Sequence, residues 1–233
     1  MLATRQFRYG GDNLGYLVYG SAKGIAIDGG AADELLAFVA ERGISLLYVA
    51  NTHAHSDHTS GNEALLSGSK ASLLAPRDLA DGRLIELDQD EIRVIHTPGH
   101  TADSLCFYTG HALIAGDTLF NGTIGNCFSG DLAGFFNSVK KVMALPDETV
   151  VYAGHDYVRD SLAFAKRLEP ENRAIDEFLQ HYDPRHVFST LAQERQINPY
   201  FRFNEPGIVG LLGRLNLPRA TEWERWQSLM SIE

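Results

Sequence analysis

The chain has 233 residues, enough for one large domain or for one domain with an appendage. It is 44% hydrophobic and 21% charged, and its formal net charge of −10, with no cluster of lysine or arginine, argues against a nucleic-acid-binding surface. Two cysteines, Cys106 and Cys127, are too few for a disulfide framework. No stretch resembles a signal peptide or a membrane span, so we expect a cytoplasmic protein that binds neither nucleic acid nor membrane. The oligomeric state stays open.

The first two thirds of the chain alternate predicted strands and helices, which is typical of an α/β architecture. In chain order, strands are expected at residues 6–9, 13–19, 24–28, 44–50, 71–75, 83–87, 91–97, 104–108, 112–115 and 149–153. Helices are expected at residues 32–42, where Gly43 ends the helix, and at 131–145.

After Gly154 the predicted strands disappear. Helical spacing of apolar residues predicts helices at residues 161–168, 172–182, 208–215 and 223–230. We therefore expect an α/β domain over residues 1–156 and a helical unit over residues 157–233 that packs on it.

The stretch with the most chemical information is Asn-Thr-His-Ala-His-Ser-Asp-His at residues 51–58, directly after a predicted buried strand. His53 and His55 are two residues apart, so their side chains leave the same face of an extended segment. Asp57 and His58 enter a turning backbone that would aim them at a second point. Imidazole and carboxylate ligands suit zinc, iron or manganese. The alternative, a solvated polar loop that happens to be rich in histidine, is weakened by the residues described next.

Three further polar residues share one context: His100, Asp117 and His155 each follow an apolar strand and a glycine. Glycine lets the backbone turn sharply and approach an ion closely. The carboxyl ends of strands are also the edge at which open α/β sheets bind ligands. Four strand ends with metal-type side chains therefore predict one shared site.

The ligand count fits two ions, with a carboxylate bridging them because it has two oxygens to share. The first ion is assigned to His53, His55 and His100. The second is assigned to Asp57, His58 and His155. Asp117 is the expected bridge. Asp28 is either an orienting partner of a ligand histidine or a turn-forming aspartate. A thiolate ligand from Cys127 is a further alternative.

Together these motifs resemble the metallo-β-lactamase superfamily and, within it, glyoxalase II, the hydroxyacylglutathione hydrolases. The resemblance rests on Thr-His-x-His-x-Asp-His at 52–58, Thr-Pro-Gly-His-Thr at 97–101, Gly-Asp-Thr-Leu-Phe at 116–120 and Gly-His-Asp-Tyr at 154–157. It continues into the helical unit at residues 162–165, 169–172, 189–192 and 198–202. The resemblance implies a four-layer αββα sandwich with a helical substrate-binding tail, a binuclear zinc, iron or manganese centre, and thioester hydrolysis.

The sequence departs from this family at the residues that hold the glycine carboxylate of glutathione. The family's cation and tyrosine in the loop after the aspartate fall on Asn126 and Phe128, and two later basic residues fall on Asn204 and Pro206. Of the substrate-binding set, the tyrosine after the last histidine, Tyr157, is kept. The thiol carrier is therefore open.

A replacement cation for the carrier could come from Arg195 or Arg202, and the sequence does not decide between them. For the chemistry, we expect two cations to share a water and lower its pKa to about 7, so that hydroxide attacks the thioester carbonyl. Asp57 and Asp117 are the expected catalytic carboxylates, and the implied reaction converts S-lactoylglutathione to lactate and a thiol. The alternatives are a lactonase or an iron persulfide dioxygenase on the same scaffold, or a non-catalytic metal-binding module.

Overall fold

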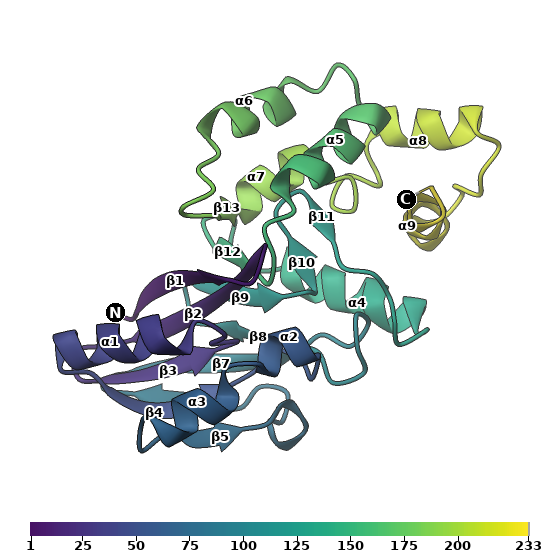
Figure 1. The fold of residues 1–233 in the computed structure, drawn as a ribbon. Coiled ribbons are helices and arrows are strands. Elements are labelled where there is room, and N and C mark those ends of the chain that lie inside the picture. The colour runs from purple at the N-terminus through teal and green to yellow at the C-terminus, as the bar shows by residue number, and fades with distance from the viewer. Residues whose placement is uncertain (233) are drawn as a thin grey trace.

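Two β-sheets lie face to face in the computed structural model, which describes residues 1–232 (Figure 1). The first sheet has the order β1 (Ala3–Tyr9), β2 (Asn13–Tyr19), β3 (Lys23–Ile27), β4 (Ser45–Ala50) and β5 (Ser72–Leu74). The second has the order β13 (Ser189–Thr190), β12 (Val150–Ala153), β9 (Ala112–Gly116), β8 (Leu105–Tyr108), β7 (Asp90–His96) and β6 (Leu84–Leu87). A short hairpin, β10 (Leu119–Phe120) and β11 (Thr123–Ile124), follows β9.

Alternation along the strands divides the hydrophobic residues between two faces of each sheet. In β2, Tyr16 and Val18 enter the core between the sheets, whereas Leu17 belongs to the outer face. In β9, Ile114 faces the same central core and Leu113 faces outward. Successive side chains of a strand point to opposite faces, so each sheet needs a cover on its outer side.

Helices supply these covers. On the first sheet, α1 (Ala32–Arg42) packs with α3 (Asn62–Ser67), and Leu35 of α1 is fully buried. On the second sheet, α4 (Leu132–Met143) buries Phe135, which contacts the ring of Trp226 in α9 (Glu222–Met230). The predicted αββα sandwich is confirmed. The helix expected to stop at Gly43 does so, because that glycine takes the left-handed conformation with φ 65°.

Helix α2 (Ser56–Thr59) is a single short turn after β4, and the four remaining α-helices of residues 1–232 stand over the edge of the sandwich that bears β12 and β13, at the top of Figure 1. They are α5 (Val158–Leu168), α6 (Arg173–His181), α7 (Leu191–Ile197) and α8 (Pro206–Arg214). Two elements here were not predicted. The expected absence of strands after Gly154 is wrong, because β13 pairs with β12, and α7 was overlooked. A two-residue strand is too short to show periodicity, but the capping box of Thr190 and Gln193 marks the start of α7.

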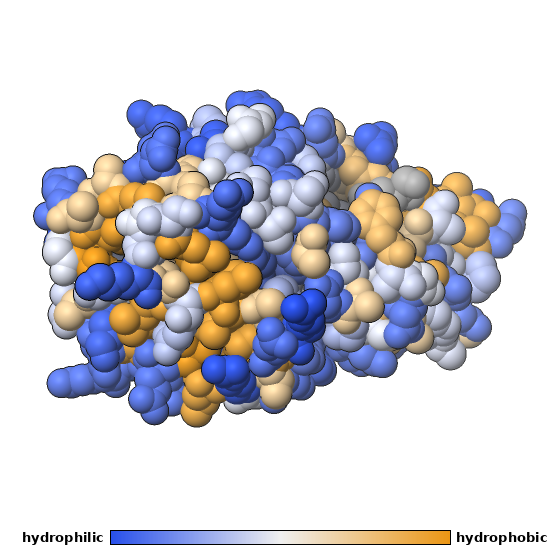
Figure 2. Space-filling view, turned by 60° about the horizontal axis from the view of Figure 1, so that its bottom comes forward, coloured by the Kyte–Doolittle hydropathy of each residue, from blue (hydrophilic) through white to orange (hydrophobic). Residues whose placement is uncertain are grey.

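Two surface features complete the description. In the face of the molecule that Figure 2 shows, apolar residues gather on the left, the side on which α1, α3 and β5 lie in Figure 1. Leu73 of the edge strand β5 is 45% exposed. Within residues 1–232, no helix is both long enough and apolar enough to cross a bilayer.

A buried carboxyl group joins the helical unit to the hairpin after β9. Glu194 of α7 accepts hydrogen bonds from Ser189 Oγ at 2.6 Å, from Asn198 Nδ2 at 2.8 Å and from the backbone nitrogen of Gly122 at 3.1 Å. Burial raises the pKa of Glu194 from 4.5 to about 7, although these hydrogen bonds oppose the shift. Between pH 4.5 and about 7, the folded protein therefore keeps a proton on Glu194 that the unfolded chain releases.

This pKa makes stability depend on pH. The contribution of Glu194 is fully present below pH 4.5 and is lost as the pH rises to about 7. Glu194→Gln keeps the size and stays neutral, so relative to wild type it should gain up to about 3 kcal/mol of unfolding free energy between pH 4.5 and pH 8. Urea unfolding of both proteins at these two pH values, in chelator, measures the gain. If the two proteins differ in unfolding free energy by the same amount at both pH values, the prediction is wrong.

Candidate metal centre

Four strand ends bring the predicted ligands to one edge of the sandwich. The histidines of residues 53–58 follow β4, and His100 follows β7 by four residues. Asp117 follows β9 directly, and His155 follows β12 by two residues. Because β9 and β12 run parallel with Gly116 opposite Ala153, Asp117 and His155 leave neighbouring strands at the same level.

Two of the glycines that precede these residues, Gly116 and Gly154, are required for different structural reasons. Gly116 has φ 51°, in the left-handed region that a side chain disfavours. At Gly154 the limit is space, because a Cβ there would lie 2.1 Å from Oδ1 of Asp117 and 2.8 Å from Cε1 of His58. A side chain at position 154 would therefore displace the two residues that the site brings together.

The first predicted group converges as expected. Nε2 of His53 lies 2.9 Å from Nδ1 of His55, and Nε2 of His100 lies 3.2 Å from the same Nδ1 atom. His53 and His100 are buried, and His55 is partly buried. The three nitrogens lie within 4.8 Å of one another, as the ligands of one ion must.

The second predicted group converges beside it. Nε2 of His58 lies 3.2 Å from Nε2 of His155. Oδ2 of Asp57 lies 3.3 Å from the His155 nitrogen and 3.6 Å from the His58 nitrogen. Asp57 is more exposed than the two histidines, so it forms the solvent side of this group.

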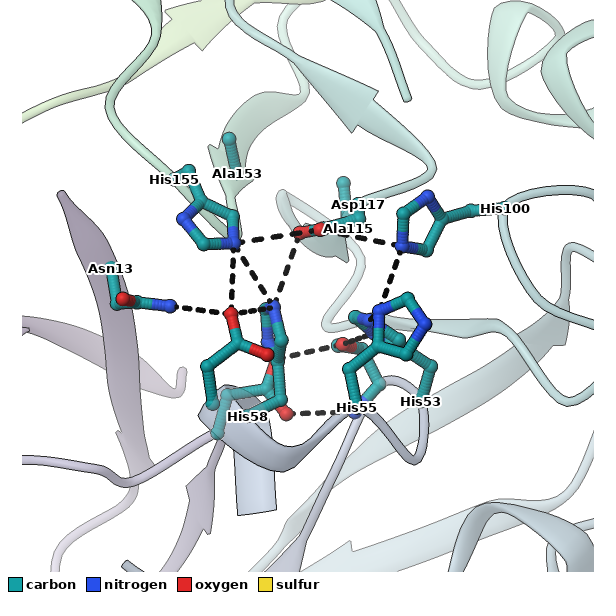
Figure 3. Close-up of polar contacts among 12 residues, drawn as sticks. Asn13, His53, His55, His58, His100, Ala115, Asp117, Ala153 and His155 are labelled. Atoms are coloured by element: carbon teal, nitrogen blue, oxygen red, sulfur yellow. Dashed lines mark hydrogen bonds and ion pairs between the residues drawn. The ribbon is translucent and has the colours of Figure 1, made fainter. Parts of the chain in front are cut away.

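Asp117 lies between the two groups (Figure 3). Its Oδ2 is 3.5 Å from Nε2 of His100 on one side and 3.5 Å from Nε2 of His155 on the other. Its Oδ1 is 3.4 Å from Nε2 of His58 and is buried without a hydrogen-bond partner among the described residues. The position is the one expected of a bridging ligand.

The donor set fits a bound cation. Nitrogen atoms of neighbouring imidazoles face one another at 2.9–3.2 Å, and a buried carboxylate oxygen has no hydrogen-bond donor. Two nitrogens bound to one tetrahedral zinc at about 2.0–2.1 Å lie roughly 3.3 Å apart, close to this spacing. Histidine nitrogen and carboxylate oxygen are the ligands that zinc, iron and manganese accept.

Polar atoms behind the histidines fix which nitrogen faces the centre. Nδ1 of His58 donates to Oδ2 of Asp28 at 2.9 Å, and Nδ1 of His100 donates to the carbonyl oxygen of Asn126 at 2.9 Å. Asp28 also accepts from the backbone nitrogen and the hydroxyl of Thr52, at 2.8 and 2.7 Å. Of the two roles considered for Asp28, an orienting partner of a histidine or a turn-forming aspartate, these contacts support the first. In each case Nε2 is left free to bind a cation.

The electrostatics of the two groups differ. Burial lowers the pKa of His53 to about 4 and also lowers the pKa of His100, so both rings are neutral at pH 7. Burial opposes the charged form of His58 as well, but the carboxylates of Asp28 and Asp117 raise its pKa to about 11. Asp117 therefore has its closest electrostatic partner in the second group.

Two neighbouring residues support the second group, Asp12 of the β1–β2 turn and Asn13 at the start of β2, and the sequence interpretation missed them. Asp12 Oδ1 accepts from Nδ1 of His155 at 3.0 Å, and Asn13 Nδ2 donates to Oδ2 of Asp57 at 2.9 Å. Burial alone would raise the pKa of Asp57, and the Asn13 amide and the charge of His58 lower it instead. No local motif reveals these contacts, because their partners lie 143 and 44 residues away.

The predicted substrate residues line the same edge. The ring of Tyr157 stacks on His155 with centroids 4.9 Å apart. Phe128 is 68% exposed, and its ring lies 5.2 Å from that of His100. Asn126 is exposed and contributes its carbonyl group to His100. The Sγ atom of Cys127 is 3.6 Å from Ser129 Oγ, and Cys127 belongs to none of the described ligand groups.

Neither arginine considered as a replacement cation is available. Arg195 is held by Asp147, with Nε 2.7 Å from a carboxylate oxygen. Arg202 makes a two-pronged ion pair with Glu169, at 2.7 and 2.9 Å. Bidentate arginine–carboxylate pairs are strong and fixed in direction, so Arg202 has a structural partner that a substrate anion would have to displace.

Comparison with known proteins defines the class first. Residues 9–81 and 70–155 match the metallo-beta-lactamase superfamily model, and residues 156–229 match the model for the hydroxyacylglutathione hydrolase C-terminus. The crystal structure of ETHE1 from Myxococcus xanthus is similar, with a TM-score of 0.68 and 25% identity over 97% of this chain and 99% of that one. The fold and the donor set are therefore those of a metal-binding enzyme of the metallo-β-lactamase superfamily.

The relatives narrow this class. Hydroxyacylglutathione hydrolase of Chromohalobacter salexigens is 36% identical over 82% of both chains. The enzyme of the same name from Nitrosococcus oceani is 35% identical over 90% of this chain and 89% of its own. The chain belongs to the hydroxyacylglutathione hydrolase family, which confirms the resemblance found in the sequence, and it is a hydrolase.

The β1–β2 turn yields a test of the second ligand group. Asn13→Ala removes the amide that holds Asp57, so the dissociation constant of one metal equivalent should rise about 10–100-fold. Competition with a chelator, followed by metal analysis, measures both equivalents. Gly11→Ala in the same turn is the control, since a Cβ there meets no atom within 4 Å. Equal weakening of both equivalents, or none, would refute the assignment of Asn13 to this group.

Proposed function

We propose that the chain is a binuclear metal-dependent thioester hydrolase that acts on hydroxyacyl thioesters such as S-lactoylglutathione. The observation that carries this proposal is Asp117, a buried carboxylate between two groups of imidazoles with one oxygen that lacks a hydrogen-bond donor. Asp117 would bridge two zinc, iron or manganese ions. One ion would be held by His53, His55 and His100. The other would be held by Asp57, His58 and His155.

A bound metal pair would lower the pKa of a water to about 7 and polarise the carbonyl group of the substrate. The residues of the chain then orient the reaction. Asp57 is held by Asn13 through Oδ2 on the solvent side of the second group, where its other oxygen can accept a hydrogen bond from the attacking water. The two imidazoles beside Asp57, those of His58 and His155, are buried. A thiolate is a good leaving group, so the site needs no strong side-chain acid.

Metal binding and substrate binding are assigned to the two predicted domains. We propose that residues 1–156 provide the metal centre and that residues 157–233 bind the substrate. Tyr157, at the start of α5, supports this division because its ring stacks on that of His155 and makes a T-shaped contact with that of Phe120, with centroids 5.0 Å apart. A thioester at the metal centre would therefore extend along α5.

The alternative enzymes are less well supported. An iron persulfide dioxygenase needs one iron and fewer ligands, whereas both ligand groups and the bridging carboxylate are assembled here. A lactonase would usually lack the helical unit that matches the hydroxyacylglutathione hydrolase C-terminus. A non-catalytic metal-binding module would have no reason to keep the solvent-side carboxylate of Asp57 in place.

Substitution of the bridge tests the proposal. Asp117→Ala should reduce bound metal from two equivalents to one or fewer and lower turnover of a lactoyl thioester by more than about a hundredfold, because both charge compensation and water positioning are lost. Metal analysis and a thiol-release assay on the same sample measure the two effects. Asp33→Ala, on the exposed face of α1, is the matched control. Wild-type turnover by Asp117→Ala would rule out the two-metal mechanism.

A further inference from the structure

A cavity of about 370 Å³ lies beside the metal centre, and it is lined by two of the predicted substrate residues, Asn126 and Tyr157, but by none of the seven predicted metal ligands. Phe120 and Tyr157 form its inner end, and both rings contact that of His155. Ile124 and Phe164 add apolar walls. The cavity therefore adjoins the second ligand group through Phe120 and Tyr157.

The far end of the cavity is defined by α5. Tyr157, Asp160, Phe164 and Arg167 are spaced by three, four and three residues, so they share one face of this helix. Ten residues separate Tyr157 from Arg167, which corresponds to about 15 Å along the helix axis. Asp160 lies near the metal end and Arg167 at the remote end.

Arg167 is the cation among the residues that line this cavity, and the described residues provide no ion-pair partner for it. Its guanidinium lies over the ring of Phe164, 5.3 Å from the centroid. Stacking on an aromatic ring holds an arginine in position while leaving its N–H groups free to donate. Arg195 and Arg202, in contrast, are occupied by Asp147 and Glu169.

We propose that Arg167 binds an anionic group, a carboxylate or a phosphate, at the remote end of a thiol carrier that lies in this cavity. This inference rests on the proposed thioester hydrolysis. Asp160 sets the direction, because its carboxylate repels an anion placed close to the metal centre. A cation on α5 would thus replace the loop cation whose position is taken by Asn126.

Binding of carriers that cannot react tests Arg167 independently of catalysis. The probes are the S-methyl thioethers of glutathione, which carries carboxylates, of coenzyme A, which carries phosphates, and of N-acetylcysteamine, which is neutral. Calorimetry with the metal-loaded protein gives their dissociation constants. Arg167→Met should weaken binding of an anionic carrier about tenfold or more, the size of one charge-assisted hydrogen bond, and change the neutral carrier less than twofold. Arg167→Lys should recover part of the loss.

The control is Arg159→Met, on the same helix, because Arg159 lies over the ring of Tyr182 and does not line the cavity. A loss confined to the glutathione thioether would identify a carboxylate, and a loss confined to the coenzyme A thioether a phosphate. Unchanged binding of both by Arg167→Met, or equal loss with the neutral carrier, would overturn the assignment. Lactoyl thioesters of the same carriers test hydrolysis separately: if none is hydrolysed, the proposed function fails while the binding result stands.

Discussion

The site depends on one constraint, the burial of the Asp117 carboxylate among imidazoles. A buried charge costs several kcal/mol unless it is paired and hydrogen-bonded. Here imidazole nitrogens approach both oxygens, yet Oδ1 has no hydrogen-bond donor within the described part of the chain. Cations held by the two proposed ligand groups would complete the pairing. The close approach of Gly154 to Asp117 serves the same arrangement, because a side chain there would separate β12 from the carboxylate.

The ligands are held from behind by atoms that the fold itself fixes. The β1–β2 turn is bound to the end of β12 by backbone hydrogen bonds from Leu14 to the Gly154 carbonyl and from Asp156 to the Asp12 carbonyl, at 2.8 and 2.9 Å. Asp12 and Asn13 therefore reach His155 and Asp57 with their positions already set. Preorganised partners of this kind reduce the reorganisation that metal binding requires.

Local patterns were sufficient to predict which side chains converge at one edge of the sandwich, because each of them follows an apolar strand and the histidine spacing is short. The helix boundaries at 32 and 42 and the strand at 13–19 agree with the structure for the same reason. Asp12 and Asn13 could not be predicted, since they act on residues that only the tertiary fold brings near. The pairing of Arg202 with Glu169 was hidden in the same way. The strand β13 was missed because two residues carry no periodic signal.

The chemistry and the choice of carrier reside in different parts of the molecule. All seven proposed ligands come from segments that follow strands of the sandwich, two of them in α2, whereas the cavity beside them is walled largely by α5 and the β10–β11 hairpin. A change on the exposed face of α5 alters the charge of the cavity without touching a ligand or the atoms that orient one. We propose that a member of the hydroxyacylglutathione hydrolase family can in this way keep its set of metal-ligand side chains while a cation on a helix, Arg167, binds the carrier of its substrate.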